Sequence, residues 1–188
     1  MRNNNVLKDK KTIRIETRAK VLEMSDNEKR EASRRIFAEV AALPEYAAAR
    51  TVAAFVSLPD EPFTGDFLDL VHRHKRLVLP RVEGETMTFY SCAPADLVRG
   101  AFGIMEPPAE AEPCAVGDID LMVVPGAAFT AEGLRLGRGK GFYDRYMSLE
   151  GFRAFTVGIC FSCALVDSLP SEPHDKMVRL AISNVAIK

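Results

Sequence analysis

Residues 120–145 of the chain read DLMVVPGAAFTAEGLRLGRGKGFYDR. The stretch opens on a short apolar run, residues 121–124, of the kind found in strands that are buried on both faces of a sheet. It closes on the start of a segment with helical character, residues 142–149, which follows a loop rich in glycine. A strand, a glycine-rich loop and a helix N-terminus in this order direct backbone N–H groups at an anion. The stretch therefore predicts an α/β fold with an anion-binding loop.

The loop combines residue types that suit a phosphate group. Three glycines at alternate positions are interleaved with Arg138 and Lys140. Glycine allows positive φ and a close approach to backbone N–H groups, while Arg and Lys supply a bidentate fork and a point charge. Asp144 follows, and a carboxylate beside phosphates is a usual ligand of Mg²⁺. We expect a site for a nucleoside triphosphate with its metal, with a flexible, solvated basic turn as the alternative.

Two familiar nucleotide motifs do not match this loop. A Walker A loop needs Ser or Thr after its Gly-Lys pair, whereas Lys140 is followed by Gly141. A dinucleotide fingerprint needs a small residue at position 142, where this chain has Phe142. The expected phosphate site is therefore of another type.

Apolar strand-like segments alternate with helical segments along the chain. Strands are predicted at residues 51–58, 76–82, 86–92, 121–124, 154–160 and 179–183, with an irregular crossover at 93–116. Helices are predicted at residues 8–24, 64–74 and 142–149, and another begins at a capping box, Ser25 to Glu28, and ends at Pro44. This alternation predicts a three-layer α/β/α sandwich around a Rossmann-like, largely parallel sheet, in a single domain over residues 1–188.

Ligands of open α/β sheets gather beyond the carboxyl ends of the strands. This rule brings together three segments: residues 59–63, residues 125–141 and the segment after Cys160. Glu61 lies in the first of them, and we leave open whether it binds a ligand or is a solvated loop carboxylate.

The composition and the chain ends exclude several other classes of protein. Hydrophobic residues make up 47% and charged residues 27%, as in an ordinary globular protein. No run of about 18 apolar residues is present, so we expect no membrane span. Residues 1–11 are polar and basic without an apolar core, so we expect no secretory signal and a cytoplasmic protein. We also expect a monomer.

The basic N-terminal region and the cysteines give weaker signals. The first 35 residues have an excess of Lys and Arg, but acidic residues interrupt them and no aromatic residue precedes Phe37, so we expect no nucleic-acid partner. Only Cys160 and Cys163 form a C-x-x-C pair, which is insufficient for a zinc site. Reduced cysteines near strands are the interpretation we favour, and a redox role for this pair stays open.

Several segments, in order along the chain, resemble the 5-formyltetrahydrofolate cyclo-ligase (5,10-methenyltetrahydrofolate synthetase) family. Residues 135–146, with Pro125-Gly126 before them, are similar to the family signature. Lys10-Lys11-Thr12-Ile13-Arg14 is similar to its N-terminal Lys-x-x-x-Arg element. The other matching segments are Ser57 to Thr64 with Asp60-Glu61, then Gly103-Ile104-Met105-Glu106-Pro107, then Leu169-Pro170 with His174-Asp175.

The resemblance implies a reaction and a set of site residues. In the family, 5-formyltetrahydrofolate and MgATP give 5,10-methenyltetrahydrofolate, ADP and phosphate. The resemblance implies that Lys10 and Arg14 contact the ATP phosphates, and that Arg138 and Lys140 act on the transferring phosphoryl group. It implies a nucleotide loop of Arg135, Leu136, Gly137, Arg138, Gly139, Lys140, Gly141, Phe142 and Tyr143. Implied folate contacts are Val56, Glu61, Arg138, Gly139, Lys140, Gly141 and Phe142, and implied magnesium ligands are Asp144 and Asp175.

The chain departs from the family pattern at three positions. Phe142 stands where tyrosine is common, Thr130 replaces a frequent aspartate, and Pro62 stiffens the loop after Glu61. These departures affect mainly the folate side of the expected site. Two other functions remain as alternatives: a related ATP-using enzyme for another amide or carboxylate, and a non-catalytic module that binds nucleotide or RNA.

Overall fold

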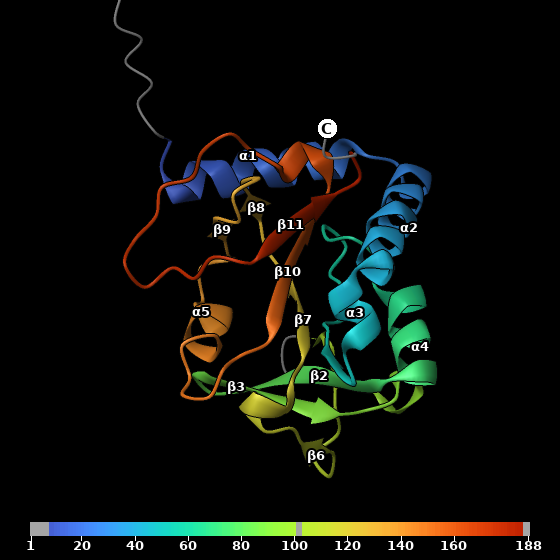
Figure 1. Cartoon of the computed structure of the whole chain (residues 1–188). Helices are drawn as coiled ribbons and strands as arrows, with labels where there is room; N and C mark the ends of the chain where they lie inside the picture. The colour runs from blue at the N-terminus through green and yellow to red at the C-terminus, as the bar shows by residue number, and fades with distance from the viewer. Residues whose placement is uncertain (1–7, 101–102, 186–188) are drawn as a thin grey trace, which may run out of the picture.

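The computed structural model describes residues 8–100 and 103–185. Its main sheet contains β1 (Thr51–Ala53), β2 (Arg76–Glu83), β3 (Thr86–Ser91), β6 (Glu112–Pro113), β7 (Leu121–Pro125), β10 (Phe155–Cys160) and β11 (Leu180–Ser183). The seven strands lie in the order β11-β10-β7-β1-β2-β3-β6. Figure 1 labels all of these strands except β1. The first five strands of this order run parallel, and β3 and β6 pair antiparallel at one edge. The sheet is therefore largely parallel, as predicted.

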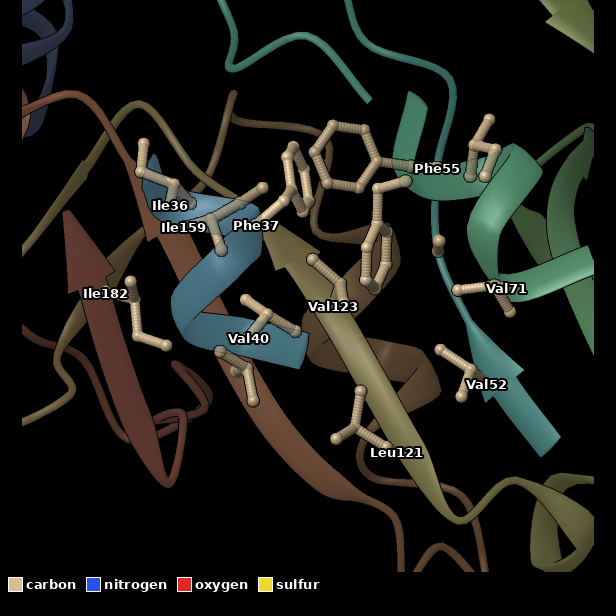
Figure 2. Packing of buried hydrophobic residues seen from close by; sticks show 14 of the residues in the cluster. Ile36, Phe37, Val40, Val52, Phe55, Val71, Leu121, Val123, Ile159 and Ile182 are labelled. Atoms are coloured by element: carbon tan, nitrogen blue, oxygen red, sulfur yellow. The ribbon is translucent and has the colours of Figure 1, made fainter. Parts of the chain in front are cut away.

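The helices α1 (Lys10–Glu23), α2 (Asp26–Ala42), α3 (Pro44–Ala48) and α4 (Gly65–His74) contribute to the core on one face of the sheet. There, Ile36, Phe37 and Val40 of α2 pack over side chains from several strands (Figure 2). On the other face lie α5 (Phe142–Tyr146) and the core side chains around it. The two helical layers confirm the predicted α/β/α sandwich.

Residues of β7 show why both faces are covered. Leu121 and Val123 belong to the core on the α2 face, whereas Met122 and Val124 belong to the core on the α5 face. Successive side chains of a strand point to opposite faces, so a continuous apolar run needs a packed layer on each side. All four side chains are fully buried.

Capping explains where the first helices begin and end. The Asp9 side chain accepts a hydrogen bond from the Thr12 N–H at the start of α1. Ser25 and Glu28 form the predicted capping box of α2. Pro44 was expected only to end this helix. It also starts α3, because proline at the first helical position loses no intrahelical hydrogen bond.

Three predicted segments differ from the structure. The strand predicted at 51–58 is shorter in the structure, where β1 ends at Ala53. Ala54 and Phe55 are still buried, so the apolar residues after Ala53 reflect burial in the core and not a longer strand. The helix predicted at 142–149 ends at Tyr146, because Ser148 and Leu149 tighten the chain with i→i−3 hydrogen bonds. Within 93–116, the described residues are not wholly irregular: they include β4 (Val98–Arg99), β5 (Met105–Glu106) and β6.

A further ribbon, β8 (Ala128–Phe129) with β9 (Arg135–Leu136), lies inside the segment expected to be a loop. The 3₁₀ turns that lie wholly within the described residues are η1 (Pro94–Asp96), η3 (Val116–Asp118) and η4 (Ser162–Ala164). Residues 1–7, 101–102 and 186–188 of the predicted single domain lie outside the described residues. Most of residues 1–11, for which we predicted no secretory signal, therefore also lie outside them. Within the described ranges, no helix has the length and apolar character to cross a bilayer.

The topology places a crevice between β1 and β7. From β1 the chain passes through α4 to β2, on one side of β1, whereas β7 pairs on the other side. The segments that leave the carboxyl ends of β1 and β7 therefore diverge, and such a switch point is the usual ligand site of an open parallel sheet.

Candidate active site

A pocket of about 350 Å³ lies at this switch point. Its wall comes from α1, from the segments after β1, β7 and β10, and from the glycine-rich loop. The lining residues are Lys11, Arg14, Ile15, Thr17, Arg18, Val21, Asp60, Pro62, Gly126, Ala127, Arg138, Cys160, Phe161 and Ala164. All three segments that the sequence nominated for a ligand contribute to this wall.

Cations dominate the charged residues of the wall. Lys11, Arg14 and Arg18 follow one another at helical spacing on α1, and Arg138 comes from the glycine-rich loop. Asp60 is the acidic residue among the lining residues. A concave surface with this charge favours a ligand that carries several negative charges.

Arg14 also ties α1 to the glycine-rich loop. Its Nε donates a hydrogen bond to the Gly137 carbonyl oxygen at 2.7 Å. Ile13, one residue earlier, packs with Leu136 and Leu169 in a small apolar cluster. Arg14, a predicted phosphate contact, thus hydrogen-bonds to the predicted nucleotide loop. Leu136 of β9 is buried against Ile13 of α1 and helps to hold the helix in place.

Arg138 is held by two carboxylates. Its terminal nitrogens donate to both oxygens of Asp60, at 2.8 and 3.1 Å, and its Nε donates to Glu61 Oε1 at 2.8 Å. The Arg138 side chain is 38% exposed, whereas the Asp60 and Glu61 side chains are 12% and 5% exposed. The structure therefore joins two residues that the sequence assigned to substrate binding, Glu61 and Arg138, at one wall of the pocket.

Glu61 is a buried acid with each oxygen in a hydrogen bond. Besides Arg138, it accepts a hydrogen bond from the Leu58 N–H at Oε2. Burial raises the pKa of the Glu61 carboxyl above its ordinary value, and the charge of Arg138 offsets only part of that rise. The alternative of a solvated loop carboxylate is wrong for Glu61, because the side chain is almost completely buried. Val56, the other implied folate contact of this segment, packs partly buried against the core on the α2 face.

The backbone of the loop depends on glycine at two positions. Gly139 and Gly141 have φ of 94° and 68°, a region that other residues rarely adopt. Between them, the Lys140 side chain is exposed, and the Lys140 carbonyl accepts a hydrogen bond from Arg145 at 3.0 Å. Phe142 lies under the guanidinium of Arg145, whose carbon is 5.1 Å from the ring centroid.

Arg135 occupies a different environment from the rest of the loop. Its side chain is only 3% exposed, and it donates to Asp144 Oδ2 at 2.7 Å and to the Pro125 carbonyl at 3.1 Å. Arg135 and Leu136 form β9, so the irregular part of the predicted nucleotide loop begins after Leu136. Tyr143 lies beside Arg135, with the guanidinium carbon 5.7 Å from the ring centroid, and burial raises the pKa of Tyr143.

The two implied magnesium ligands are linked through Lys176, which follows one of them and hydrogen-bonds to the other. Asp144 Oδ1 accepts a hydrogen bond from the Lys176 N–H at 3.1 Å, and Lys176 follows Asp175 in the chain. Lys10 Nζ contacts Asp175 Oδ2 at 2.7 Å and Glu172 Oε2 at 2.6 Å. Oxygen ligands from one or two carboxylates are what Mg²⁺ requires, so this donor set fits the ion.

Asp175, Glu172 and His174 also present ligand atoms within 4.8 Å of one another. Lys10, which the sequence assigned to ATP phosphates, is the cation that neutralises two of these groups. Burial by itself would raise the pKa of Asp175, but the hydrogen bonds from Lys10 and from the Glu172 N–H, together with the charge of Lys10, outweigh it and the pKa is lowered.

Sequence reasoning assigned no role to Lys11, Arg18 or Asp60. The helical spacing of Lys11, Arg14 and Arg18 is a signal that could have placed them on one face of α1. For Asp60 the sequence offers no comparable signal, because its partner Arg138 is distant in the chain.

Comparison with known proteins agrees with the family expected from the sequence. A profile of the 5-formyltetrahydrofolate cyclo-ligase family matches residues 6–184. The 5-formyltetrahydrofolate cyclo-ligase of Mycolicibacterium smegmatis is 34% identical over 134 residues, which cover 67% of this chain and 69% of the relative. That of Escherichia coli K12 is 32% identical over 139 residues, covering 70% and 76%.

A solved structure shares the fold. The 5,10-methenyltetrahydrofolate synthetase of Aquifex aeolicus superimposes with a TM-score of 0.83 at 34% identity, covering 93% of this chain and 89% of the other. The described elements therefore follow the architecture of that enzyme over nearly their full extent.

Proposed function

Because the chain belongs to the 5-formyltetrahydrofolate cyclo-ligase family, we propose that it converts 5-formyltetrahydrofolate to 5,10-methenyltetrahydrofolate with MgATP, releasing ADP and phosphate. One observation of the structure carries the proposal most directly. A cationic pocket at the switch point of the sheet contains Arg138, which also contacts the buried carboxylate of Glu61. A group for phosphate and a group for a polar substrate therefore meet at one place.

The chemical difficulty is an unreactive formamide. Its oxygen becomes a leaving group when it receives the γ-phosphoryl group of ATP. The folate N10 then attacks the formyl carbon and loses its proton, the C–O bond breaks, and phosphate departs with the electron pair. Such a reaction depends on the positioning of the reactants and on stabilisation of charge more than on a protein nucleophile.

The residues of the chain supply both functions in this proposal. Arg138 and Lys140 stabilise the charge on the transferring phosphoryl group, and Lys10 and Arg14 contact the other phosphates. Exposure of the Lys140 side chain leaves it free to move toward a phosphate, and the pocket lining includes Arg14. Glu61 accepts hydrogen bonds from the folate, and loop residues 138–142 contact both substrates.

Asp144 and Asp175 hold Mg²⁺ in the proposal, and the ion neutralises negative charge on the phosphates of ATP. Arg135 and Lys10 are the ion-pair partners of these carboxylates in the structure. Mg²⁺ at Asp175 would take the place of the Lys10 ammonium group, which would then be available to the phosphates.

The test is optical. The methenyl product contains an extended conjugated iminium and absorbs in the near ultraviolet, where 5-formyltetrahydrofolate does not. We expect this band to appear only when the protein, ATP and Mg²⁺ are all present. Binding of ATP without any product band would overturn the proposal and favour a non-catalytic nucleotide-binding module. Hydrolysis of ATP stimulated by another amide or carboxylate, but not by the folate, would favour the related enzyme.

A further inference from the structure

Asp60 has a contact pattern that none of the assigned roles uses. Both of its carboxylate oxygens accept hydrogen bonds from the two terminal nitrogens of Arg138. Its Oδ2 also lies 3.3 Å from Nε of Arg18, a residue of α1. Asp60 thus joins the loop after β1, the glycine-rich loop and α1 at the wall of the pocket.

The pair with Arg138 has the geometry that restricts a guanidinium most. A carboxylate that accepts from both terminal nitrogens fixes the plane of the guanidinium as well as its distance. Glu61 adds a third hydrogen bond at Nε, on a different edge of the group. The guanidinium still has N–H groups beyond these three, and Arg138 lines the pocket.

We propose that Asp60 is a positioning residue, which holds the Arg138 guanidinium in a fixed orientation so that its remaining N–H groups are presented to the transferring phosphoryl group. The inference rests on the proposed function. Asp60 itself makes no contact with the reacting atoms in this account. Glu61 alone leaves Arg138 free to rotate about one hydrogen bond, whereas Asp60 removes that rotation.

Two opposite effects distinguish positioning from a simple structural role. Removing the charge of Asp60 makes the pocket more positive, because Asp60 is the acidic residue among cations. The ground-state affinity for MgATP is therefore unchanged or increased. Catalysis falls at the same time, because a displaced catalytic group costs far more in rate than in binding.

The experiment compares Asp60→Asn and Asp60→Glu with the unmodified protein. Asn keeps the size of the side chain and removes its charge, while Glu keeps the charge and displaces the carboxylate by one methylene. For both variants we expect kcat of ring closure to fall about tenfold to a hundredfold. The affinity for a non-hydrolysable ATP analogue with Mg²⁺, measured by calorimetry, is expected to stay the same or increase for Asn and to stay the same for Glu.

A double-mutant cycle and a surface control complete the design. In an Arg138→Ala background, Asp60→Asn is expected to cause no further loss of kcat, because the group that it positions is gone. Asp66→Asn, an exposed carboxylate of α4, serves as the control and is expected to leave kcat unchanged.

The outcomes separate this inference from the proposed function. If the unmodified protein forms no methenyl product, the proposed function fails before Asp60 is tested. If it is active but both Asp60 variants keep kcat, or if Asp60→Asn lowers kcat equally with and without Arg138, the positioning role is wrong. A variant that loses rate only in proportion to a lowered melting temperature also contradicts it.

Discussion

Arg138→Ala tests the centre of the proposed site, because it removes the proposed catalytic cation and the partner of two carboxylates in one step. Loss of one preorganised donor commonly raises the barrier by about 2.7–4 kcal/mol, so we expect kcat to fall about 10²–10³-fold. KM for ATP is expected to rise much less, since Lys11, Arg14 and Arg18 still line the pocket.

The same change predicts a loss of stability with a definite pH dependence. Removal of one partner from a fully buried ion pair costs about 3–5 kcal/mol. Arg138 is 38% exposed, so solvent screens the pair and we expect a smaller loss, about 1–2 kcal/mol near neutral pH. Glu61 keeps its hydrogen bond from Leu58 but loses its neighbouring cation.

The sign of the pH effect follows from Glu61 and Asp60. Burial already raises the pKa of Glu61, and the loss of Arg138 raises it further. A group whose pKa is raised by folding contributes stability that is present at low pH and lost as pH rises through the folded-state pKa. Burial would also raise the pKa of Asp60, but the hydrogen bonds and the charge of Arg138, together with a backbone hydrogen bond and the charge of Arg18, lower it. The unmodified protein therefore gains stability from Asp60 above its ordinary pKa. Both carboxyls have higher pKa values in the variant than in the unmodified protein, so the difference in stability between the two proteins should shrink as the pH falls from neutral to about 4 and below.

The assay combines single-turnover absorbance with melting temperatures at several pH values. Arg73→Ala removes an exposed arginine of α4 and provides the matched control, for which we expect unchanged kcat. Near-native kcat in a folded Arg138→Ala protein would refute the catalytic role. A stability difference that is constant from pH 7 to pH 4 would refute the assignment of the carboxylate pair.

Three further changes test the remaining assignments. Lys140→Ala should lower kcat about 10²-fold or more, with an unchanged melting temperature because the side chain is exposed; equal rates would remove Lys140 from the site. Glu61→Gln should weaken folate use by about 1.5–3 kcal/mol while MgATP affinity changes less, and equal rises of both KM values would count against it. Asp144→Asn should shift the magnesium titration of activity to higher concentration, with Asp175→Asn acting in the same direction more weakly; an unshifted midpoint for Asp144→Asn would exclude its metal role.

The sequence predicted the fold well where burial and pairing coincide. β2, β3, β7 and β10 lie close to their predicted bounds, because their apolar pattern reflects strands within the sheet. The predicted strand at 51–58 was longer than β1, because the residues after β1 are buried in the core and are therefore as apolar as a buried strand. Sequence reasoning also missed β9, because two residues give no detectable alternation.

The sequence did not predict the side-chain contacts in the site between residues that are far apart in the chain. The glycine pattern identified the loop, and the resemblance supplied Glu61, but neither indicated that Arg138 would contact Glu61 and Asp60. The burial of Arg135 could not be predicted either, because an arginine next to a glycine-rich loop looks like a surface residue. Its partners, Asp144 and the Pro125 carbonyl, become neighbours only after the chain has folded.

The place of α1 has a consequence for biosynthesis. Arg14 meets Gly137 across 123 positions of the chain, and Lys10 meets Asp175 across 165. During translation, the helix that carries the cations is made well before these partners, because they lie more than a hundred positions later. A nascent chain arrested after β7 contains strands of the central sheet, but it lacks the glycine-rich loop that completes the pocket. Contacts of such high sequence separation form late because closing long loops costs entropy. Capture on immobilised ATP should therefore distinguish finished, folded molecules from arrested or prematurely terminated ones.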